Sequence, residues 1–256
     1  MNKFLIVVEG HADVAFLKSY LSYLLDNNKD FVKIKTLSKS QQKKKQQKEG
    51  KEKNKDEDKK KIMVPERVFD TPIIDIFPLD GCTKLFEYHQ DIIDIKNEAI
   101  DKEQNFHLLM IQDADNPKKH HGGVAARLEY LKAVKKQIEE KESITFDFET
   151  FLFPNHKDDG DLETLLMSII NQEEYNKFFA CYQSYCCCIK PYANPSSIDS
   201  LLENKSKIFS YVQTHRGQEF ANEGKRDYKD GLWNLDSEYL EPLKKFLLDK
   251  FIEFSH

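Results

Sequence analysis

The segment FHLLMIQDAD (residues 106–115) constrains the fold most strongly, because it is a nearly continuous apolar run that ends in two aspartates. Such a run is typical of a strand that is buried on both faces of a parallel sheet. Similar runs occupy residues 4–8, 72–79 and 144–154, and helical patterns lie between and after the runs. Strands that alternate with helices predict an α/β fold. We expect a mostly parallel, Rossmann-like sheet that is flanked by helices and joined by right-handed crossovers.

The chain divides into three kinds of sequence. Residues 1–170 contain the alternation of strands and helices and are expected to form one α/β domain. Residues 33–61 lie within it but have almost nothing to bury, so they are expected to form a Lys-rich, flexible surface insertion. From residue 171 the pattern is helical, which predicts that residues 171–256 form a helical C-terminal extension packed on the domain.

The charge is unevenly distributed along the chain. Residues 33–61 hold thirteen lysines and five acidic residues, so this segment contributes +8 to a net charge of −5 and the remainder carries −13. A lysine tract can contact phosphates, although most such tracts are only solvated. An acidic body is unusual for a protein that binds nucleic acid, since contacts to phosphates come from lysine and arginine.

The sequence also predicts where in the cell the protein is found. No apolar run approaches the ~18 residues that cross a bilayer. The N-terminal apolar run stops at Glu9, so it is interpreted as a buried strand rather than a signal peptide, and a cytoplasmic protein without membrane contact is expected.

The five cysteines, three of them at residues 186–188, indicate neither a disulfide framework nor a zinc site and are interpreted as core thiols.

Acidic residues follow three of the expected strands. Ligands of open α/β sheets gather at the carboxyl ends of the strands, so these carboxylates should converge. They are Glu9, Asp13, Asp113, Asp115, Asp161 and Glu163. Converging carboxylates repel one another unless cations neutralise them, and hard oxygen ligands suit Mg²⁺ or Mn²⁺. Asp161 has an equally good alternative role as the cap of a helix that begins near Leu162.

Four segments resemble, in order, the motifs of the Toprim family. LIVVEGHADVAFL resembles its first motif, an apolar strand followed by Glu-Gly-x-x-Asp, and PLDGCTKL fits the strand-then-glycine element that follows. LLMIQDADNP resembles the Asp-x-Asp motif. FLFPN and GDLETLL resemble the metal-binding Gly-x-x-Glu segment of the overcoming-lysogenisation-defect nucleases. The resemblance covers about residues 1–170 and implies a Toprim-like sheet. The Lys-rich insertion is not part of the family pattern.

The resemblance implies a role for each acidic residue. Glu9 would be a metal ligand or the general acid/base, and Asp13 a supporting ligand. Asp113 and Asp115 would bind one ion, whereas Asp161 and Glu163 would hold a second. With two Mg²⁺ or Mn²⁺ ions, one activates water and the other stabilises the leaving oxygen.

Basic residues complete the expected site. A lysine late in the chain often neutralises the scissile phosphate in the nuclease branch, and Lys225 is the candidate for this catalytic role. Arg226 and Lys229 are alternatives, as is an exposed lysine with no role. Weaker candidates for contact with nucleic acid are Gly10, His11, Lys118 and Lys119.

These features together predict a metal-dependent nuclease that acts on DNA or RNA. Roles in repair or phage defence follow only by analogy with the family. The expected partners are nucleic acid, a separate ATPase (since no ATPase domain precedes the first motif) and a second copy of the chain. One alternative is a degenerate, non-enzymatic Toprim module that binds nucleic acid or a protein. Another is a Mg²⁺-dependent phosphohydrolase or phosphotransferase. The haloacid-dehalogenase type is disfavoured because it needs a nucleophilic aspartate where this chain has Glu9.

Overall fold

A five-stranded sheet forms the centre of the computed structural model, which describes residues 2–27, 65–70 and 73–253. The strands are β1 (Asn2–Val8), β2 (Glu66–Asp70), β3 (Ile73–Pro78), β4 (Asn105–Asp113) and β5 (Glu149–Phe153). Their order is β2-β3-β1-β4-β5, and every neighbouring pair is parallel except β2 and β3. The predicted α/β fold with a mostly parallel, helix-flanked sheet is therefore confirmed.

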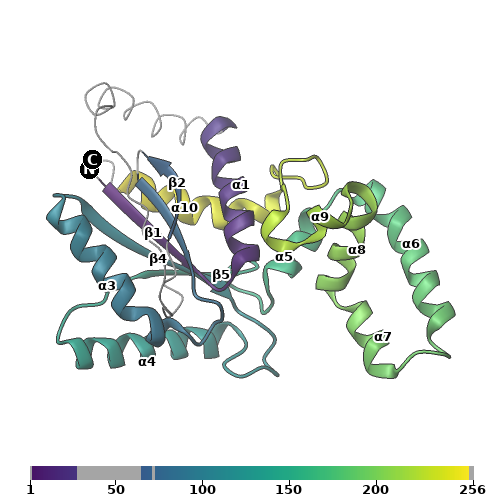
Figure 1. Ribbon diagram of the computed structural model, residues 1–256, viewed down its shortest axis with the longest axis horizontal. Coiled ribbons are helices and arrows are strands. Elements are labelled where there is room, and N and C mark those ends of the chain that lie inside the picture. Colours follow the sequence, from purple (N-terminus) through teal and green to yellow (C-terminus); the bar gives the residue numbers. More distant parts are fainter. Residues whose placement is uncertain (1, 28–64, 71–72, 254–256) are drawn as a thin grey trace, which may run out of the picture.

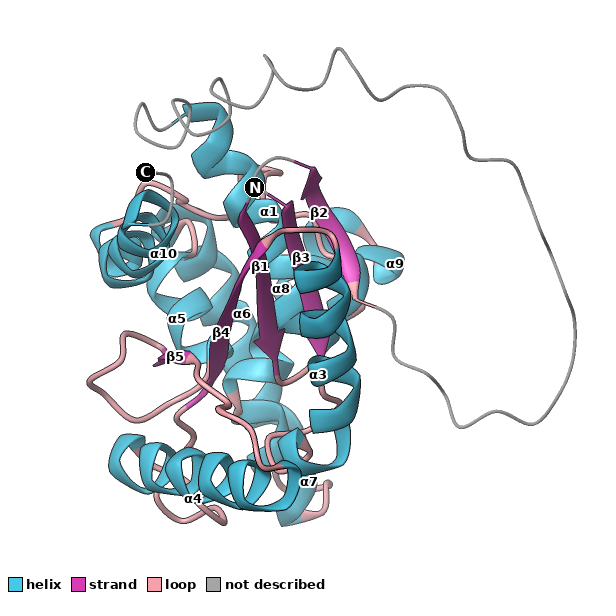
Figure 2. Ribbon diagram, turned by 90° about the vertical axis from the view of Figure 1, so that its left-hand side faces the viewer, coloured by secondary structure: helices cyan, strands magenta, loops and turns pink. Residues whose placement is uncertain are grey.

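Helices cover both faces of the sheet (Figures 1 and 2). One face packs against α3 (Leu85–Asp101) and α4 (Val124–Glu142). The other face packs against α1 (His11–Asn27), α5 (Leu162–Ile169) and α10 (Glu241–Glu253). The remaining elements are α6 (Gln172–Ile189), α7 (Pro195–Leu202), α8 (Asn204–Arg216), α9 (Gln218–Ala221), and the 3₁₀ turns η2 (Glu223–Lys225) and η3 (Glu238–Leu240).

The central strand β1 shows why the sheet needs two helical layers. Successive side chains of a strand point to opposite faces. Leu5 and Val7 belong to the core beneath α3 and α4, whereas Phe4, Ile6 and Val8 belong to the core beneath α1 and α10. All five are at most 1% exposed. A strand of this kind is stable only when helices cover both of its faces.

The C-terminal residues share a core with the sheet. The ring of Phe251 in α10 lies 4.7 Å from that of Phe4, centroid to centroid. Ile170 and Trp233 form a β-bridge between the end of α5 and the segment that leads to α10. Helices α6 and α8 extend away from the sheet, on the right of Figure 1. They reach the core through Tyr175 and Tyr211.

Three local features differ from the expectations. The edge strand β2 was not predicted. Strand β5 begins at Glu149 rather than near residue 144. Before it, Phe146 packs into the core beneath α4, and its backbone N–H donates to the side chain of Glu139. The expectation of core thiols was wrong for Cys181, Cys187 and Cys188, which are exposed on α6. The Lys-rich segment 33–61 lies outside the described residues.

Among the described helices, none combines the length and the apolar character that a membrane span requires.

Candidate functional site

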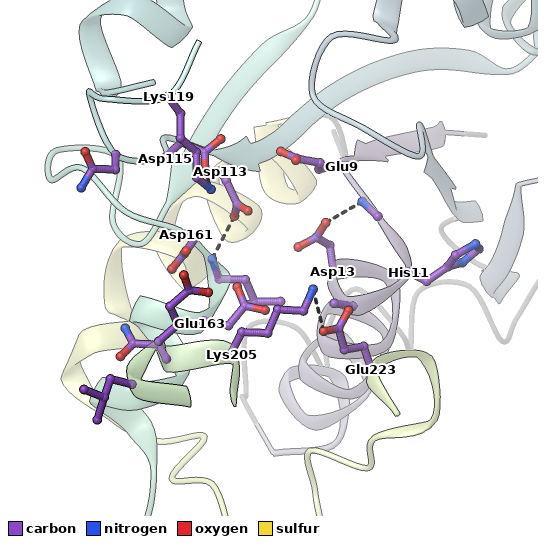
Figure 3. Close-up of a pocket in the computed structure, with 17 residues that line it drawn as sticks. Glu9, His11, Asp13, Asp113, Asp115, Lys119, Asp161, Glu163, Lys205 and Glu223 are labelled. Carbon is purple, nitrogen blue, oxygen red and sulfur yellow. Dashed lines mark hydrogen bonds and ion pairs between the residues drawn. The ribbon is translucent and has the colours of Figure 1, made fainter. Parts of the chain in front are cut away.

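The cavity at the carboxyl ends of β1 and β4 collects the acidic residues. It has a volume of about 640 Å³ and is bordered by the starts of α1, α5 and α8 and by η2. Among the described residues, eight acidic residues line it: Glu9, Asp13, Asp113, Asp115, Asp161, Glu163, Glu203 and Glu223. Figure 3 shows Glu9, after β1, Asp13, in the first turn of α1, and Asp113, at the end of β4, approaching a common space. We call this space the acidic cavity.

The turn after β1 holds two of these carboxylates in place. The strand ends at Val8, and α1 begins at His11. The backbone N–H of Gly10 donates to Oδ2 of Asp13 at 2.7 Å, which orients Asp13 across the first turn of α1. Only 5% of Asp13 is exposed. Glu9 is half-buried, and its Oε2 atom is buried without a hydrogen-bond partner among the described residues.

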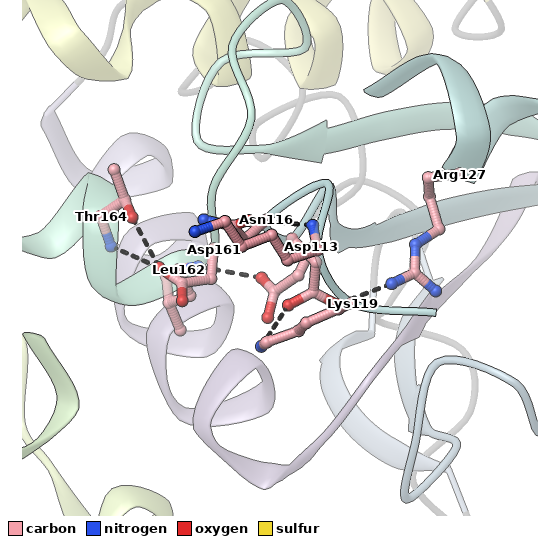
Figure 4. Close-up of polar contacts among 9 residues, drawn as sticks. Asp113, Asn116, Lys119, Arg127, Asp161, Leu162 and Thr164 are labelled. Atoms are coloured by element: carbon pink, nitrogen blue, oxygen red, sulfur yellow. Dashed lines mark hydrogen bonds and ion pairs between the residues drawn. The ribbon is translucent and has the colours of Figure 1, made fainter. Parts of the chain in front are cut away.

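The aspartates at the end of β4 and in the loop that follows it have different contacts. Oδ1 of Asp113 accepts a hydrogen bond from the backbone N–H of Leu162 at 2.9 Å, so Asp113 is tied to the start of α5 (Figure 4). Asp115 has a left-handed backbone (φ 64°) and forms a β-bridge with Gly160. Its Oδ1 lies 2.6 Å from Nζ of Lys119, and its Oδ2 lies 2.7 Å from Nη2 of Arg127. Both oxygens of Asp115 are therefore paired with cations.

The start of α5 supplies two more acidic residues. Asp161 is the N-cap of the helix, and its Oδ1 accepts from the backbone N–H of Thr164 at 2.9 Å and from the Thr164 hydroxyl at 2.6 Å. The capping role that the sequence left open for Asp161 is confirmed. Glu163 lies in the first turn of α5, where the helix dipole favours negative charge, and it lines the cavity.

Burial raises the pKa of four of these carboxyl groups. For Glu9 and Glu163 the main cause is loss of solvent, and the next is the charge of Asp115 and Asp161, respectively. Burial also raises the pKa of Asp13 to about 8, with Glu9 adding to the effect and the Gly10 N–H opposing it. The pKa of Asp113 is raised well above its usual range by burial and then by Asp13. The cluster thus favours either bound protons or a bound cation.

Two lysines stand at the border of the acidic cavity. The hydrogen bond to Asp115 raises the pKa of Lys119. Nζ of Lys205, in α8, lies 2.9 Å from Oε1 of Glu223, and this contact raises the pKa of Lys205 (Figure 3). Lys205, Glu223 and Arg127 could not be predicted from the sequence, because none lies beside a strand end or in a recognisable motif.

The structure brings most of the candidate residues together. All six acidic candidates line the acidic cavity, as do Gly10, His11 and Lys119. Figure 3 shows the imidazole of His11 pointing away from the carboxylates. Two candidates do not line the cavity. Lys225 lies in η2, where its Nζ is 3.1 Å from Glu219, and it lines a different cavity. Lys118 follows the loop residue Asn116, whose side chain accepts from the Lys118 backbone N–H.

A carboxylate-rich cavity fits a hard divalent cation such as Mg²⁺. Glu9 contributes an unpartnered buried oxygen, and Asp113 has one oxygen that is not needed for its bond to Leu162. Atoms of Glu9, Cys82 and Asp115 all lie within 4.8 Å of one another. This trio suits Mg²⁺ less well, because a thiol is a soft ligand and Asp115 is already paired with two cations.

The comparisons with known proteins concern nearly the whole chain. A family model described as "Protein of unknown function (DUF3226)" matches residues 3–252. No curated protein and no solved structure shows a significant match.

Proposed function

The chain belongs to the DUF3226 family, and we propose that it is a metal-dependent enzyme that cleaves phosphodiester bonds in nucleic acid at the acidic cavity. The observation that carries the proposal is the gathering of eight acidic residues in one cavity of about 640 Å³ at the carboxyl ends of two parallel strands. The order of these residues along the chain also resembles that of the Toprim motifs, and this resemblance is a second source of support for the proposal.

The donor set favours one or two Mg²⁺ or Mn²⁺ ions. Asp113, Glu163 and Glu9 are the residues that would hold them, since Asp161 caps α5 and Asp115 is paired with two cations. Bound ions of this kind neutralise phosphate charge and make water a stronger nucleophile.

The protein's own groups account for the remaining chemistry. Glu9 has a raised pKa and an unpartnered buried oxygen, so it can hold or accept a proton at Oε2. Lys119 and Lys205 approach from two sides and can contact the non-bridging oxygens of a phosphodiester. Arg127 orients Asp115, and Asp115 in turn holds Lys119 at the border of the cavity.

A non-enzymatic binding module is the second candidate. The pairing of both Asp115 oxygens favours it, because an aspartate of the Asp-x-Asp segment that is bound to two cations is not free to bind a metal ion. The two candidates differ in whether Mg²⁺ or Mn²⁺ binds the acidic cavity and in whether nucleic acid is cut.

The decisive experiment compares the wild type with Asp113→Asn. The amide oxygen of asparagine can still accept from Leu162, whereas the charge that would bind the ion is lost. Supercoiled plasmid and single-stranded DNA and RNA are incubated with Mg²⁺, Mn²⁺ or EDTA. Asp101→Asn is the matched control, because Asp101 is exposed at the end of α3, before the amino end of β4.

We expect cleavage with metal that stops in EDTA and in Asp113→Asn but persists in Asp101→Asn. Metal binding without cleavage would count against a nuclease and leave a phosphohydrolase or phosphotransferase open. If calorimetry finds no binding of Mg²⁺ or Mn²⁺ to the wild type, the enzyme proposal fails and the binding module takes its place.

A further inference from the structure

A second cavity lies on the other side of η2, and its charge is opposite to that of the acidic cavity. It has a volume of about 450 Å³ and is lined by α1, by Val68 of β2 and by the segment after Glu223. Of the described residues that line it, Lys18, Lys225, Arg226 and Lys229 are cationic and Asp227 alone is acidic. Three serine and alanine residues of α1 complete the wall. We call this cavity the basic groove.

One face of α1 connects the two cavities. His11, Ala15, Lys18 and Ser22 are spaced by four, three and four residues, so they lie along a single face of the helix. His11 lines the acidic cavity, whereas the other three line the basic groove. The outward direction of the His11 ring in Figure 3 agrees with this arrangement. The face therefore runs from the acidic cavity to the far end of the basic groove.

The turn η2 joins the cavities a second time. Glu223 lines the acidic cavity, and the next two residues, Gly224 and Lys225, line the basic groove. Gly224 packs closely on α1, since a Cβ atom built on it would lie 3.8 Å from Cβ of His11. The two cavities are thus neighbours that meet at His11 and η2.

The dimensions fit a short length of polynucleotide. From His11 to Ser22 the helix rises by about 16 Å at roughly 1.5 Å per residue. A strand of nucleic acid in B-form rises about 3.4 Å per nucleotide, so this face spans roughly five nucleotides. The lysines that line the groove lie within that length.

Within the described residues, the lysines of the groove are held by contacts that phosphate can replace. Lys18 pairs with Glu66, and Lys225 pairs with Glu219 at 3.1 Å, and in both pairs each side chain is about half exposed or more. Exposed pairs of this kind contribute only ~0–1 kcal/mol to stability. Nζ of Lys229 donates to the Ser22 hydroxyl. Beneath them, Arg226 is only 4% exposed and is anchored on the Ala221 carbonyl, so it adds a fixed positive charge.

We propose that the basic groove binds the phosphate backbone of the nucleic acid whose scissile phosphodiester enters the acidic cavity. The inference rests on the proposed function and names how its substrate is held. It also resolves the conflict between an acidic body and a polyanionic substrate, because the phosphates beside the cleaved one contact the lysines rather than the carboxylates. Lys225, expected from the sequence to be catalytic, is thereby assigned to substrate binding.

The test measures affinity separately from cleavage. The variant Lys18→Gln/Lys229→Gln removes two exposed charges of the groove, and Lys132→Gln/Lys136→Gln removes two exposed charges of α4 on the other side of the sheet. Binding of fluorescein-labelled single-stranded and duplex DNA is followed by anisotropy over a series of salt concentrations. Ca²⁺ replaces Mg²⁺ to prevent cleavage, and the series is repeated in EDTA.

We expect the groove variant to bind about tenfold more weakly, whereas the α4 variant stays within about twofold of the wild type. The slope of log affinity against log salt should fall by about 1.4 to 1.8 in the groove variant, as two lost phosphate contacts require. Lys225→Gln should weaken binding in the same direction.

The outcomes separate this inference from the proposed function. Weaker binding by the groove variant supports the groove even if the wild type cuts nothing, in which case the nuclease proposal alone fails. Equal affinity of the groove variant and the wild type overturns the groove even if the wild type cuts DNA. Absence of any binding by the wild type, in Ca²⁺ and in EDTA, also overturns it.

Discussion

Nη2 of Arg127 lies 2.7 Å from Oδ2 of Asp115, in an ion pair whose side chains are 0% and 7% exposed. Arg127 comes from the first turn of α4, and Asp115 from the loop after β4. Cys82 and Glu9 also lie near the guanidinium, and the pKa of Arg127 is raised although its burial acts in the opposite direction. The pair therefore links Asp115, which lines the acidic cavity, to α4, which covers the face of the sheet opposite α1.

Replacing Arg127 by methionine should destabilise the protein by about 3–5 kcal/mol, because it leaves a buried carboxylate with one exposed cation as its partner. Urea unfolding followed by circular dichroism measures the loss. Arg127→Met/Asp115→Asn should recover part of it, since the double variant leaves no unpaired buried charge. A loss below about 1 kcal/mol in the single variant would show that the pair is not a structural support.

Two substitutions of Asp161 separate capping from metal binding. Asp161→Ala should cost about 1 kcal/mol, the usual effect of losing an N-cap, whereas Asp161→Asn should cost little because asparagine caps equally well. If capping is the whole role of Asp161, Asp161→Asn binds Mg²⁺ like the wild type in calorimetry. A tenfold or greater loss of Mg²⁺ affinity in Asp161→Asn would instead make Asp161 a ligand as well.

Asp113→Asn should stabilise the metal-free protein, because burial and the neighbouring carboxylates oppose ionisation of Asp113. The same variant should gain less from Mg²⁺, since a ligand is missing. The measurement is the melting temperature in EDTA and in Mg²⁺ at about pH 8, where the wild type should show the larger rise. The idea is contradicted if Mg²⁺ stabilises both proteins equally.

The metal-free protein should become less stable as the pH rises from about 5 to about 8. Burial raises the pKa of Asp13 to about 8, so folding favours the protonated form. A raised carboxyl pKa gives stability that is complete below the ordinary pKa and is lost as the pH passes the folded one. Melting temperatures in EDTA across this range should fall for the wild type and change less for Asp13→Asn. Parallel curves for the two proteins would argue against an uncompensated charge at Asp13.

Sequence patterns were sufficient to predict the sheet and the acidic residues that border it. A buried strand can be recognised from an apolar run of neighbouring residues, and the carboxyl ends of parallel strands meet at one edge of the sheet. For that reason Glu9 and Asp113 could be placed in one cavity although 104 positions separate them in the sequence. The edge strand β2 was missed because a five-residue strand on one side of a sheet has little apolar pattern of its own.

The basic residues were harder to predict, because their position depends on how distant segments pack. Lys225 and Lys205 both lie in polar, helical sequence, and only the packing of η2 and α8 decides which of them borders the acidic cavity. Arg127 is in the first turn of an amphipathic helix, where an arginine is normally exposed. Arg127 is buried where it pairs with Asp115, and no periodic pattern in the sequence reveals this pairing.

The sheet order β2-β3-β1-β4-β5 also has a consequence for the biosynthesis of the protein. Strand β1 lies in the middle of the sheet, and both of its neighbours begin at least 65 positions later in the sequence. Contacts between such distant segments form slowly. Lys205 and Glu223, which also line the acidic cavity, are synthesised later still. Glu9 and Asp13 are therefore synthesised long before Asp113, and the acidic cavity is complete only after Glu223 has left the ribosome.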